Sequence, residues 1–358
     1  MATPPPSAEA QLAFLTKLQR LFAEGDFTAT YKFALLIALA DLAVERGTDT
    51  GDGLQLTTRQ IAERFIQLYW RQAAPYGIGR VGAEPGVLVQ NMGAQAAVVT
   101  AIATFRSNVM TSSPQMAALH ADFPKLLSAV AQTVTAQPLN YLQNFGGTTD
   151  EFLYERAPGK VLLKPGVAFC FRRFQPLVHQ LARSHWVDHI KGNRRNQAVL
   201  GNADDLEQFL FETPRQSLSL LGAALRKLDG AKCFYCGDRI TATEVDHFVP
   251  FAQYPRDLVH NFVLAHPACN RSKSDTLAAK RHLQRWMCRL MERTDELAEI
   301  GREVGMVADA HVSRRVAGWG YASALAAGAR AWVGPNLFER VDDTYLHLID
   351  VGAVGQNL

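Results

Sequence analysis

The stretch "CFYCGDRITATEVDHFVPFAQYPRDLVHNFVLAHPACNRSKSD", residues 233–275, decides the fold of the second half of the chain. It contains two pairs of metal-binding side chains, Cys233 with Cys236 and His266 with Cys269, and each pair encloses two residues. Two such pairs supply the four nitrogen and sulfur ligands of a tetrahedral zinc site. The 29 residues between the pairs exceed the spacing of a simple zinc ribbon. The spacing therefore predicts a zinc clip with a further structural unit inserted in it.

Two other interpretations of the cysteines compete with the zinc clip. A redox Cys-x-x-Cys motif is expected next to a βαβ pattern, which residues 225–240 do not offer, and it leaves the second pair unexplained. His266 could also be a surface histidine, with Cys269 a small buried residue.

The start of the chain, "MATPPPSAEA" (1–10), lacks the basic and apolar segments of a signal peptide. A reducing cytoplasmic location is therefore expected, and metal binding is favoured over disulfides.

The residues inside the clip predict a strand, a loop, a second strand and a helix. The first strand ends at the Asp246–His247 pair, the second begins near Asn261, and the helix follows the turn that starts at Pro267. A histidine with adjacent hard oxygen ligands in this layout suits phosphodiester cleavage, because a metal must stabilise charge on the phosphate while a neutral imidazole takes a proton from water. A carboxylate and an amide oxygen are suitable ligands for Mg²⁺.

The combination "CFYCG…EVDHFVP…HNFVLAHPACNRSKSD" resembles the HNH (ββα-metal) endonucleases of the zinc-clip subtype, over 43 residues of the chain. The resemblance implies that His247 is the general base. It implies that Asp246 and Asn270 hold a catalytic Mg²⁺ or Mn²⁺, and that Asn261 ties down the loop that carries His247. Asn270 stands where other members carry histidine.

The resemblance also assigns the remaining residues of the motif. Cys233, Cys236, His266 and Cys269 would hold a structural Zn²⁺, with His266 in place of a more usual cysteine. Arg271 and Lys273 stand where contacts with phosphate groups are expected.

The fold class predicted for the whole chain is α+β, with a mostly helical N-terminal region before a small ββα-metal nuclease domain and C-terminal helices. An apolar run at 33–44 is short and interrupted by Asp41, so it predicts a buried helix and no membrane segment. Next, Thr57 or Thr58 would cap a helix, and turn signals at 151–175 predict a hairpin. The predicted parts are a disordered lead-in (1–10), a helical recognition or regulatory domain (11–150), a basic connector (151–225), the nuclease domain (226–290) and a C-terminal helical segment (291–358).

Positive charge is concentrated in two blocks, although the formal net charge is only +3. Residues 231–290 contain nine Lys and Arg against five Asp and Glu, and residues 160–196 contain eight against one. Such blocks suit a polyanion, and Lys191, Arg194 and Arg195 are predicted to contact nucleic acid. A solvated surface is the alternative interpretation.

The function predicted from these features is a metal-dependent DNA endonuclease in restriction or phage defence. RNA is not excluded as a substrate, because the chemistry touches only the phosphate. A zinc-clip module that binds nucleic acid without catalysis is one alternative, and an RNase or nickase of the same fold is another. The N-terminal helical region would then form a homodimer or bind a protein partner.

Overall fold

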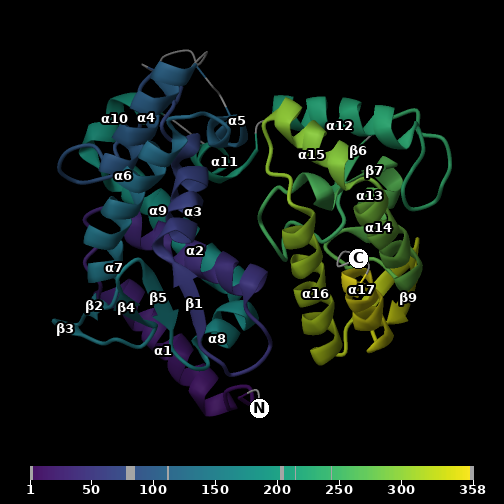
Figure 1. The fold of residues 1–358 in the computed structure, drawn as a ribbon, viewed down its shortest axis with the longest axis horizontal. Helices are drawn as coiled ribbons and strands as arrows, with labels where there is room; N and C mark the ends of the chain where they lie inside the picture. The colour runs from purple at the N-terminus through teal and green to yellow at the C-terminus, as the bar shows by residue number, and fades with distance from the viewer. Residues whose placement is uncertain are drawn as a thin grey trace. The chain divides into compact units, whose positions relative to one another are not determined.

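The protein is described by a computed structural model over residues 3–77, 85–110, 113–201, 205–213, 215–242 and 244–354. The chain divides into two compact units, Met1–Glu212 and Thr213–Leu358, which we call the first and the second unit. Each is described by itself. The path of the chain through both units can be followed in Figure 1.

The first unit is mostly helical, as predicted. Its helices are α1 (Ala8–Glu24), α2 (Tyr31–Arg46), α3 (Thr58–Trp70), α4 (Ala97–Val109), α5 (Pro114–Ala118), α6 (Phe123–Ala136), α7 (Pro138–Tyr141), α8 (Val167–Arg173), α9 (Gln175–Gly192), the 3₁₀ helix η1 (Arg194–Asn196), α10 (Gln197–Leu200) and α11 (Leu206–Phe211). Its strands are β1 (Leu54–Thr57), β2 (Asn144–Phe145), β3 (Thr148–Thr149), β4 (Tyr154–Ala157) and β5 (Lys160–Leu163).

Helix α2 forms the centre of the first unit. Fifteen of its 16 residues are buried, because it packs against α3, α8 and α9. A helix that is apolar nearly all round must be covered on all sides, so the prediction of a buried helix is confirmed. The helix also buries Asp41, which accepts hydrogen bonds from His179 Nε2 (2.8 Å) and Gln175 Nε2 (3.2 Å) on α9.

The predicted hairpin is present as β4 and β5, and it joins β1 in an antiparallel sheet of order β1-β5-β4. Helix α3 starts beside this sheet with a capping box, in which the Thr57 side chain accepts from Gln60 N and Gln60 in turn accepts from Thr57 N. Residues 151–212 therefore belong to the first unit, whereas the sequence analysis placed 151–225 in a connector. Pairing between strands about 100 residues apart leaves no local trace in the sequence.

The predicted disordered lead-in differs from the structure over residues 3–10. Thr3 N donates to Asp52 Oδ1 (3.0 Å) and Gly51 N donates to Thr3 O (2.9 Å). The side chain of Ser7 accepts from Ala10 N and caps α1. The proline-rich start is therefore fixed by contacts with the turn before β1, while residues 1 and 2 lie outside the described part of the chain.

The second unit contains the predicted ββα arrangement within a set of helices. Its helices are α12 (Arg215–Asp229), the 3₁₀ helix η2 (Val259–Asn261), α13 (Pro267–Lys273), α14 (Lys280–Glu292), α15 (Thr294–Val304), α16 (Ala310–Ala326) and α17 (Thr344–Val354). Its strands are β6 (Glu244–His247), β7 (Phe262–Ala265), β8 (Arg330–Gly334) and β9 (Leu337–Arg340).

Strands β6 and β7 pair antiparallel, so that His247 lies opposite Phe262. Helix α13 packs on β6, and α12 packs on both strands. Helix α14 holds the loop after β6, because the ring of Trp286 stacks on Phe248 at 4.7 Å. The segment predicted as separate at 291–358 is part of the same unit, since Trp332 of β8 donates its indole N–H to Ser272 on α13 (3.0 Å).

Throughout the described ranges, no helix has both the length and the apolar character that crossing a bilayer requires.

Candidate active site and metal centre

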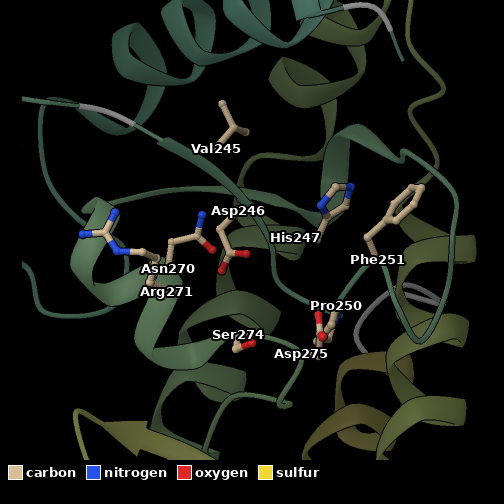
Figure 2. Close-up of a pocket in the computed structure, with 9 residues that line it drawn as sticks. All are labelled: Val245, Asp246, His247, Pro250, Phe251, Asn270, Arg271, Ser274 and Asp275. Atoms are coloured by element: carbon tan, nitrogen blue, oxygen red, sulfur yellow. The ribbon is translucent and has the colours of Figure 1, made fainter. Parts of the chain in front are cut away.

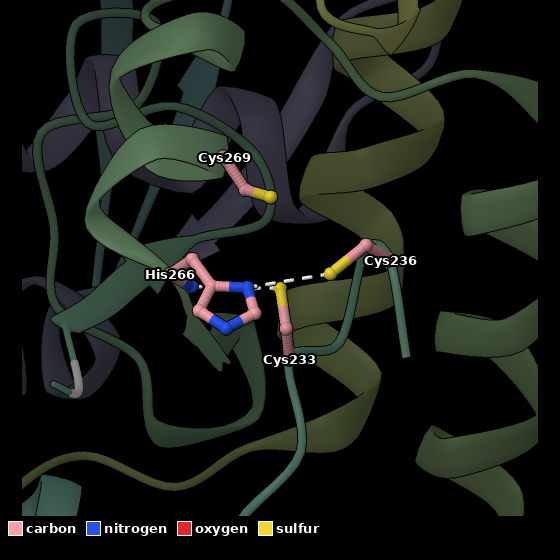
Figure 3. Close-up of side chains that lie close together, drawn as sticks. All are labelled: Cys233, Cys236, His266 and Cys269. Carbon is pink, nitrogen blue, oxygen red and sulfur yellow. Dashed lines mark hydrogen bonds between the residues drawn. The ribbon is translucent and has the colours of Figure 1, made fainter. Parts of the chain in front are cut away.

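Four side chains converge at the edge of the ββα arrangement (Figure 3). Cys233 and Cys236 lie on the turn before β6, His266 precedes α13, and Cys269 lies in its first turn. Their ligand atoms all lie within 4.8 Å of one another, as the ligands of a single ion must. Gly237, with φ of 83°, closes the turn after Cys236 in a conformation that favours glycine. The predicted pairing of the two motifs is thus present in the fold.

The donor set and its surroundings fit Zn²⁺. The Nε2 atom of His266 lies 3.1 Å from Arg239 O, while Nδ1 lies 3.3 Å from Cys236 Sγ. A ring N–H that donates to a carbonyl leaves the other nitrogen as the metal ligand. Burial raises the pKa of the Cys233 thiol, but hydrogen bonds from backbone N–H groups, including that of His266, lower it further, so the net shift is downward. The Cys₃His cluster is therefore consistent with a structural zinc.

A cleft of about 280 Å³ opens on the ββα arrangement (Figure 2). Strand β6, the loop after it and α13 supply its walls. The lining residues are Val245, Asp246, His247, Pro250, Phe251, Asn270, Arg271, Ser274 and Asp275. Four residues predicted for the site, Asp246, His247, Asn270 and Arg271, are thus brought to one place.

Asp246 is held by two neighbouring side chains. Tyr235 donates its phenol to Asp246 Oδ2 at 2.5 Å, and Lys273 Nζ lies 3.1 Å from the same oxygen. Burial, together with the charge of Asp246, raises the pKa of Tyr235 well above its usual range, so the phenol remains a donor. The carboxylate is thus fixed before any metal binds.

Lys273 differs from its prediction as a phosphate contact. Its side chain is fully buried, and Nζ also donates to His247 O at 2.9 Å. Burial lowers the pKa of Lys273, and the neighbouring Asp246 opposes this shift. An ammonium group enclosed in this way does not reach a phosphate, because it lies on the face of α13 that packs against β6. Arg271, in contrast, is exposed on the cleft wall.

Asn270 is oriented by Glu244, which accepts from Asn270 Nδ2 at 2.9 Å. The amide oxygen of Asn270 is therefore the atom that remains for a metal. Figure 2 shows the amide directed toward the carboxylate of Asp246. One carboxylate and one amide oxygen form a hard-oxygen donor set that fits Mg²⁺ or Mn²⁺.

His247 is held on three sides. Its Nε2 lies 2.6 Å from Asp257 Oδ1, and its ring lies 4.2 Å from that of Phe262 and 5.2 Å from that of Phe251. The side chain is 20% exposed and lines the cleft. With Nε2 engaged, Nδ1 is the nitrogen that remains for proton transfer.

Asn261 is buried and ties the loop after His247 to η2. Its Oδ1 accepts from Val249 N (2.8 Å), and its Nδ2 donates to Val249 O (2.9 Å). Its backbone oxygen also accepts from Phe248 N at 2.7 Å. Asn261 is not among the residues that line the cleft, so this geometry suits the expected loop-tying role and not a contact with substrate.

The predicted basic contacts of the 160–196 block lie in the first unit. Lys191 lies in the last turn of α9, and Arg194 and Arg195 lie in η1, all three with exposed side chains. The block is not a uniform surface, because Arg172 is buried and pairs with Asp49 at 2.8 Å.

The sequence analysis did not single out Asp257, Tyr235 or Glu244, although each contacts a predicted site residue. Tyr235 lies inside the Cys233–Cys236 turn, and Glu244 lies two residues before Asp246 on the same face of β6. Spacing could have indicated these two. Asp257 lies in an irregular segment, and no periodic pattern marks it.

Comparisons with known proteins agree with this geometry. Residues 233–276 match the family described as HNH endonuclease, which confirms the resemblance seen in the sequence. Residues 11–210 match the family described as Domain of unknown function (DUF8808). No curated protein and no solved structure gives a match. The chain therefore belongs to the DUF8808 family, and its second unit carries an HNH endonuclease domain.

Proposed function

We propose that this protein is a metal-dependent endonuclease that hydrolyses phosphodiester bonds of DNA. The observation that carries the proposal is that Asp246, His247 and Asn270 line one cleft, in the same unit as the Cys₃His cluster. A module that only binds nucleic acid has no need of a histidine, a carboxylate and an amide oxygen in one cleft.

The residues divide the chemistry between them. His247 accepts a proton from water through Nδ1, because Nε2 is engaged by Asp257. Asp246 and the amide oxygen of Asn270 would hold Mg²⁺ or Mn²⁺. Such a metal, when bound, stabilises negative charge on the phosphate and on the leaving oxygen. Arg271, exposed on the wall, contacts the phosphate backbone.

The zinc in this proposal has a structural role. Cys233 and Cys236 precede β6, whereas His266 and Cys269 follow β7. Held by these four residues, a zinc ion would link the two ends of the β6–β7 pair and fix the start of α13, which carries Asn270.

The architecture favours a restriction or phage-defence role. The first unit is larger than the HNH domain and has its own core around α2. A unit of that size is suited to aim or restrain a nuclease, through a homodimer or a protein partner.

The test uses supercoiled plasmid incubated with purified wild-type or His247→Ala protein, in Mg²⁺, Mn²⁺ or EDTA. Metal-dependent nicking or linearisation by the wild type alone is expected. His347→Ala is the matched control, since His347 is an exposed histidine of the same unit.

Other outcomes separate the alternatives. Cleavage by His247→Ala at the wild-type rate removes His247 as the base. Cleavage of RNA or of RNA–DNA hybrids in preference to DNA supports an RNase or nickase. Binding to DNA without cleavage, across metals and substrates, supports the non-catalytic zinc-clip module.

A further inference from the structure

We propose that Asp257 is a positioning residue for His247, which fixes the orientation and the tautomer of the imidazole so that Nδ1 faces the cleft as the base. This inference rests on the proposed nuclease function and assigns a role to a residue outside the HNH signature.

The contact is short and shielded. Asp257 Oδ1 lies 2.6 Å from His247 Nε2, and the Asp257 side chain is 14% exposed. Asp257 follows His247 by ten residues and approaches the ring from the loop between β6 and η2. Asp257 is not among the residues that line the cleft, so it contacts the imidazole without itself forming part of the cleft wall.

The ring has little freedom in the remaining directions. Phe262, the partner of His247 across the β6–β7 pair, lies with its ring centre 4.2 Å from the imidazole. Phe251 lies 5.2 Å away. These aromatic contacts restrict the plane of the ring but do not distinguish its two nitrogens. A polar partner at one ring nitrogen does so, and Asp257 is such a partner at Nε2.

A carboxylate is the partner that makes this distinction. Ionised Asp257 has acceptor oxygens and no proton to donate, so His247 must carry its proton on Nε2. The neutral ring then presents an unprotonated Nδ1. The same carboxylate stabilises the positive charge that forms on the ring when Nδ1 takes a proton from water.

Asp257 is itself held in place. Thr213 donates to its carboxylate through both the side chain and the backbone N–H. These donors, together with His247, compensate a buried carboxylate that would otherwise lack partners. A series of hydrogen bonds thus runs from Thr213, at the start of the second unit, through Asp257 to the imidazole of His247 and fixes its orientation.

The experiment compares wild type, Asp257→Asn and Asp257→Glu, with Asp343→Asn as a matched exposed control in the same unit. The first readout is the ¹⁵N spectrum of the neutral His247 ring in metal-free protein without nucleic acid, assigned by its loss in His247→Ala. Wild type is expected to show the proton on Nε2. Asp257→Asn is expected to show a mixture or the opposite tautomer, because an amide can also donate to Nε2.

The second readout is metal-dependent plasmid cleavage. Asp257→Asn is expected to lower kcat by about 100-fold or more with KM little changed. Asp257→Glu is expected to recover part of the loss. Zinc content and thermal stability are measured alongside, so that misfolding of a variant is recognised.

The two proposals fail in different ways. If wild type cleaves and Asp257→Asn keeps both the tautomer and the rate, the positioning role is overturned while the nuclease stands. If wild type cuts no substrate but Asp257→Asn changes the tautomer, the nuclease proposal fails while control of the ring by Asp257 is supported. A folded Asp257→Asn variant with wild-type tautomer but low kcat also overturns the positioning role.

Discussion

An Asp–His pair in each unit joins Nε2 of the ring to a carboxylate oxygen at a similar distance, but the surroundings of the two pairs differ. In the first unit, His179 Nε2 lies 2.8 Å from Asp41, and the two side chains are 3% and 2% exposed. In the second unit, His247 Nε2 lies 2.6 Å from Asp257, and the His247 ring lines a cleft. Under the proposed function, an Asp–His contact alone is not enough for a general base. The second ring nitrogen must also reach water, next to oxygen ligands for a metal.

The largest effect is expected from disrupting the zinc clip. The His247–Asp257 pair lies in the same unit as the clip, whereas the His179–Asp41 pair lies in the first unit. Cys236→Ser should remove most of the bound zinc and destabilise the second unit by as much as about 10 kcal/mol, because the metal binds the folded site. The first unit, with no ligand in the cluster, should keep its own unfolding transition. Elemental analysis and scanning calorimetry measure both.

Cys288→Ser is the matched control, since Cys288 is an exposed cysteine of the second unit outside the cluster. Zinc stoichiometry equal to wild type in Cys236→Ser would defeat the clip assignment.

Removing each histidine should separate catalysis from stability. His247→Ala should lower plasmid cleavage by about 10²–10⁴-fold, the usual contribution of a general base. His179→Ala should leave the cleavage rate of folded protein unchanged but reduce the free energy of unfolding by about 2–3 kcal/mol, because the buried Asp41 loses a donor. Denaturant titration and single-turnover cleavage give the two quantities. A His179→Ala protein that is folded but inactive would break the comparison.

The basic residues of the first unit test whether that unit contributes to nucleic-acid binding. Replacing Lys191, Arg194 and Arg195 together with alanine should weaken DNA binding. The slope of log K against log salt should become shallower by about 0.9 for each phosphate that the variant no longer neutralises. Binding isotherms at several salt concentrations measure the slope, and an unchanged slope would identify the patch as a solvated surface.

The smallest effect is expected on the stability at low pH. Burial raises the pKa of Asp257, but the hydrogen bond and charge of His247 and the hydrogen bonds from Thr213 lower it further, so the pKa lies below its ordinary value. A carboxyl group with a lowered folded pKa stabilises the fold above its unfolded pKa, near 4, and loses this contribution as pH falls through the folded value. Asp257→Asn should therefore lose less stability than wild type below about pH 4. Thermal unfolding from pH 7 to pH 3 measures the difference, and parallel curves would contradict it.

Much of the candidate site could be predicted from sequence, because its residues sit at short spacings on β6, β7 and α13. The spacing of the cysteine and histidine pairs predicts the clip, and the resemblance to the HNH endonucleases adds the expected roles of Asp246, His247 and Asn270. Lys273 shows the limit of this reasoning. It lies three residues after Asn270, so a helix brings both side chains to the face that packs on β6. The motif suggested a phosphate contact, and the register of the helix gives a buried partner for Asp246 instead.

Asp257 could not be predicted in the same way. Its approach to His247 depends on the path of the loop between β6 and η2, which Asn261 and Trp286 fix through contacts with Val249 and Phe248. Irregular backbone carries no periodicity that would indicate such proximity. In the first unit, the apolar pattern of α2 predicted a buried helix, whereas the pairing of β1 with β5 required the folded chain.

The hydrogen bonds from Thr213 to Asp257 show which residues a fragment must contain in addition to the HNH signature. The match to the DUF8808 family ends at residue 210, and the second unit begins at Thr213. A fragment that starts at α12 would keep every zinc ligand, Asp246, His247 and Asn270, yet it would leave Asp257 without its anchor. A graft of the HNH domain onto another protein should therefore include Thr213 and join the chain before it, after the match to the DUF8808 family ends at residue 210.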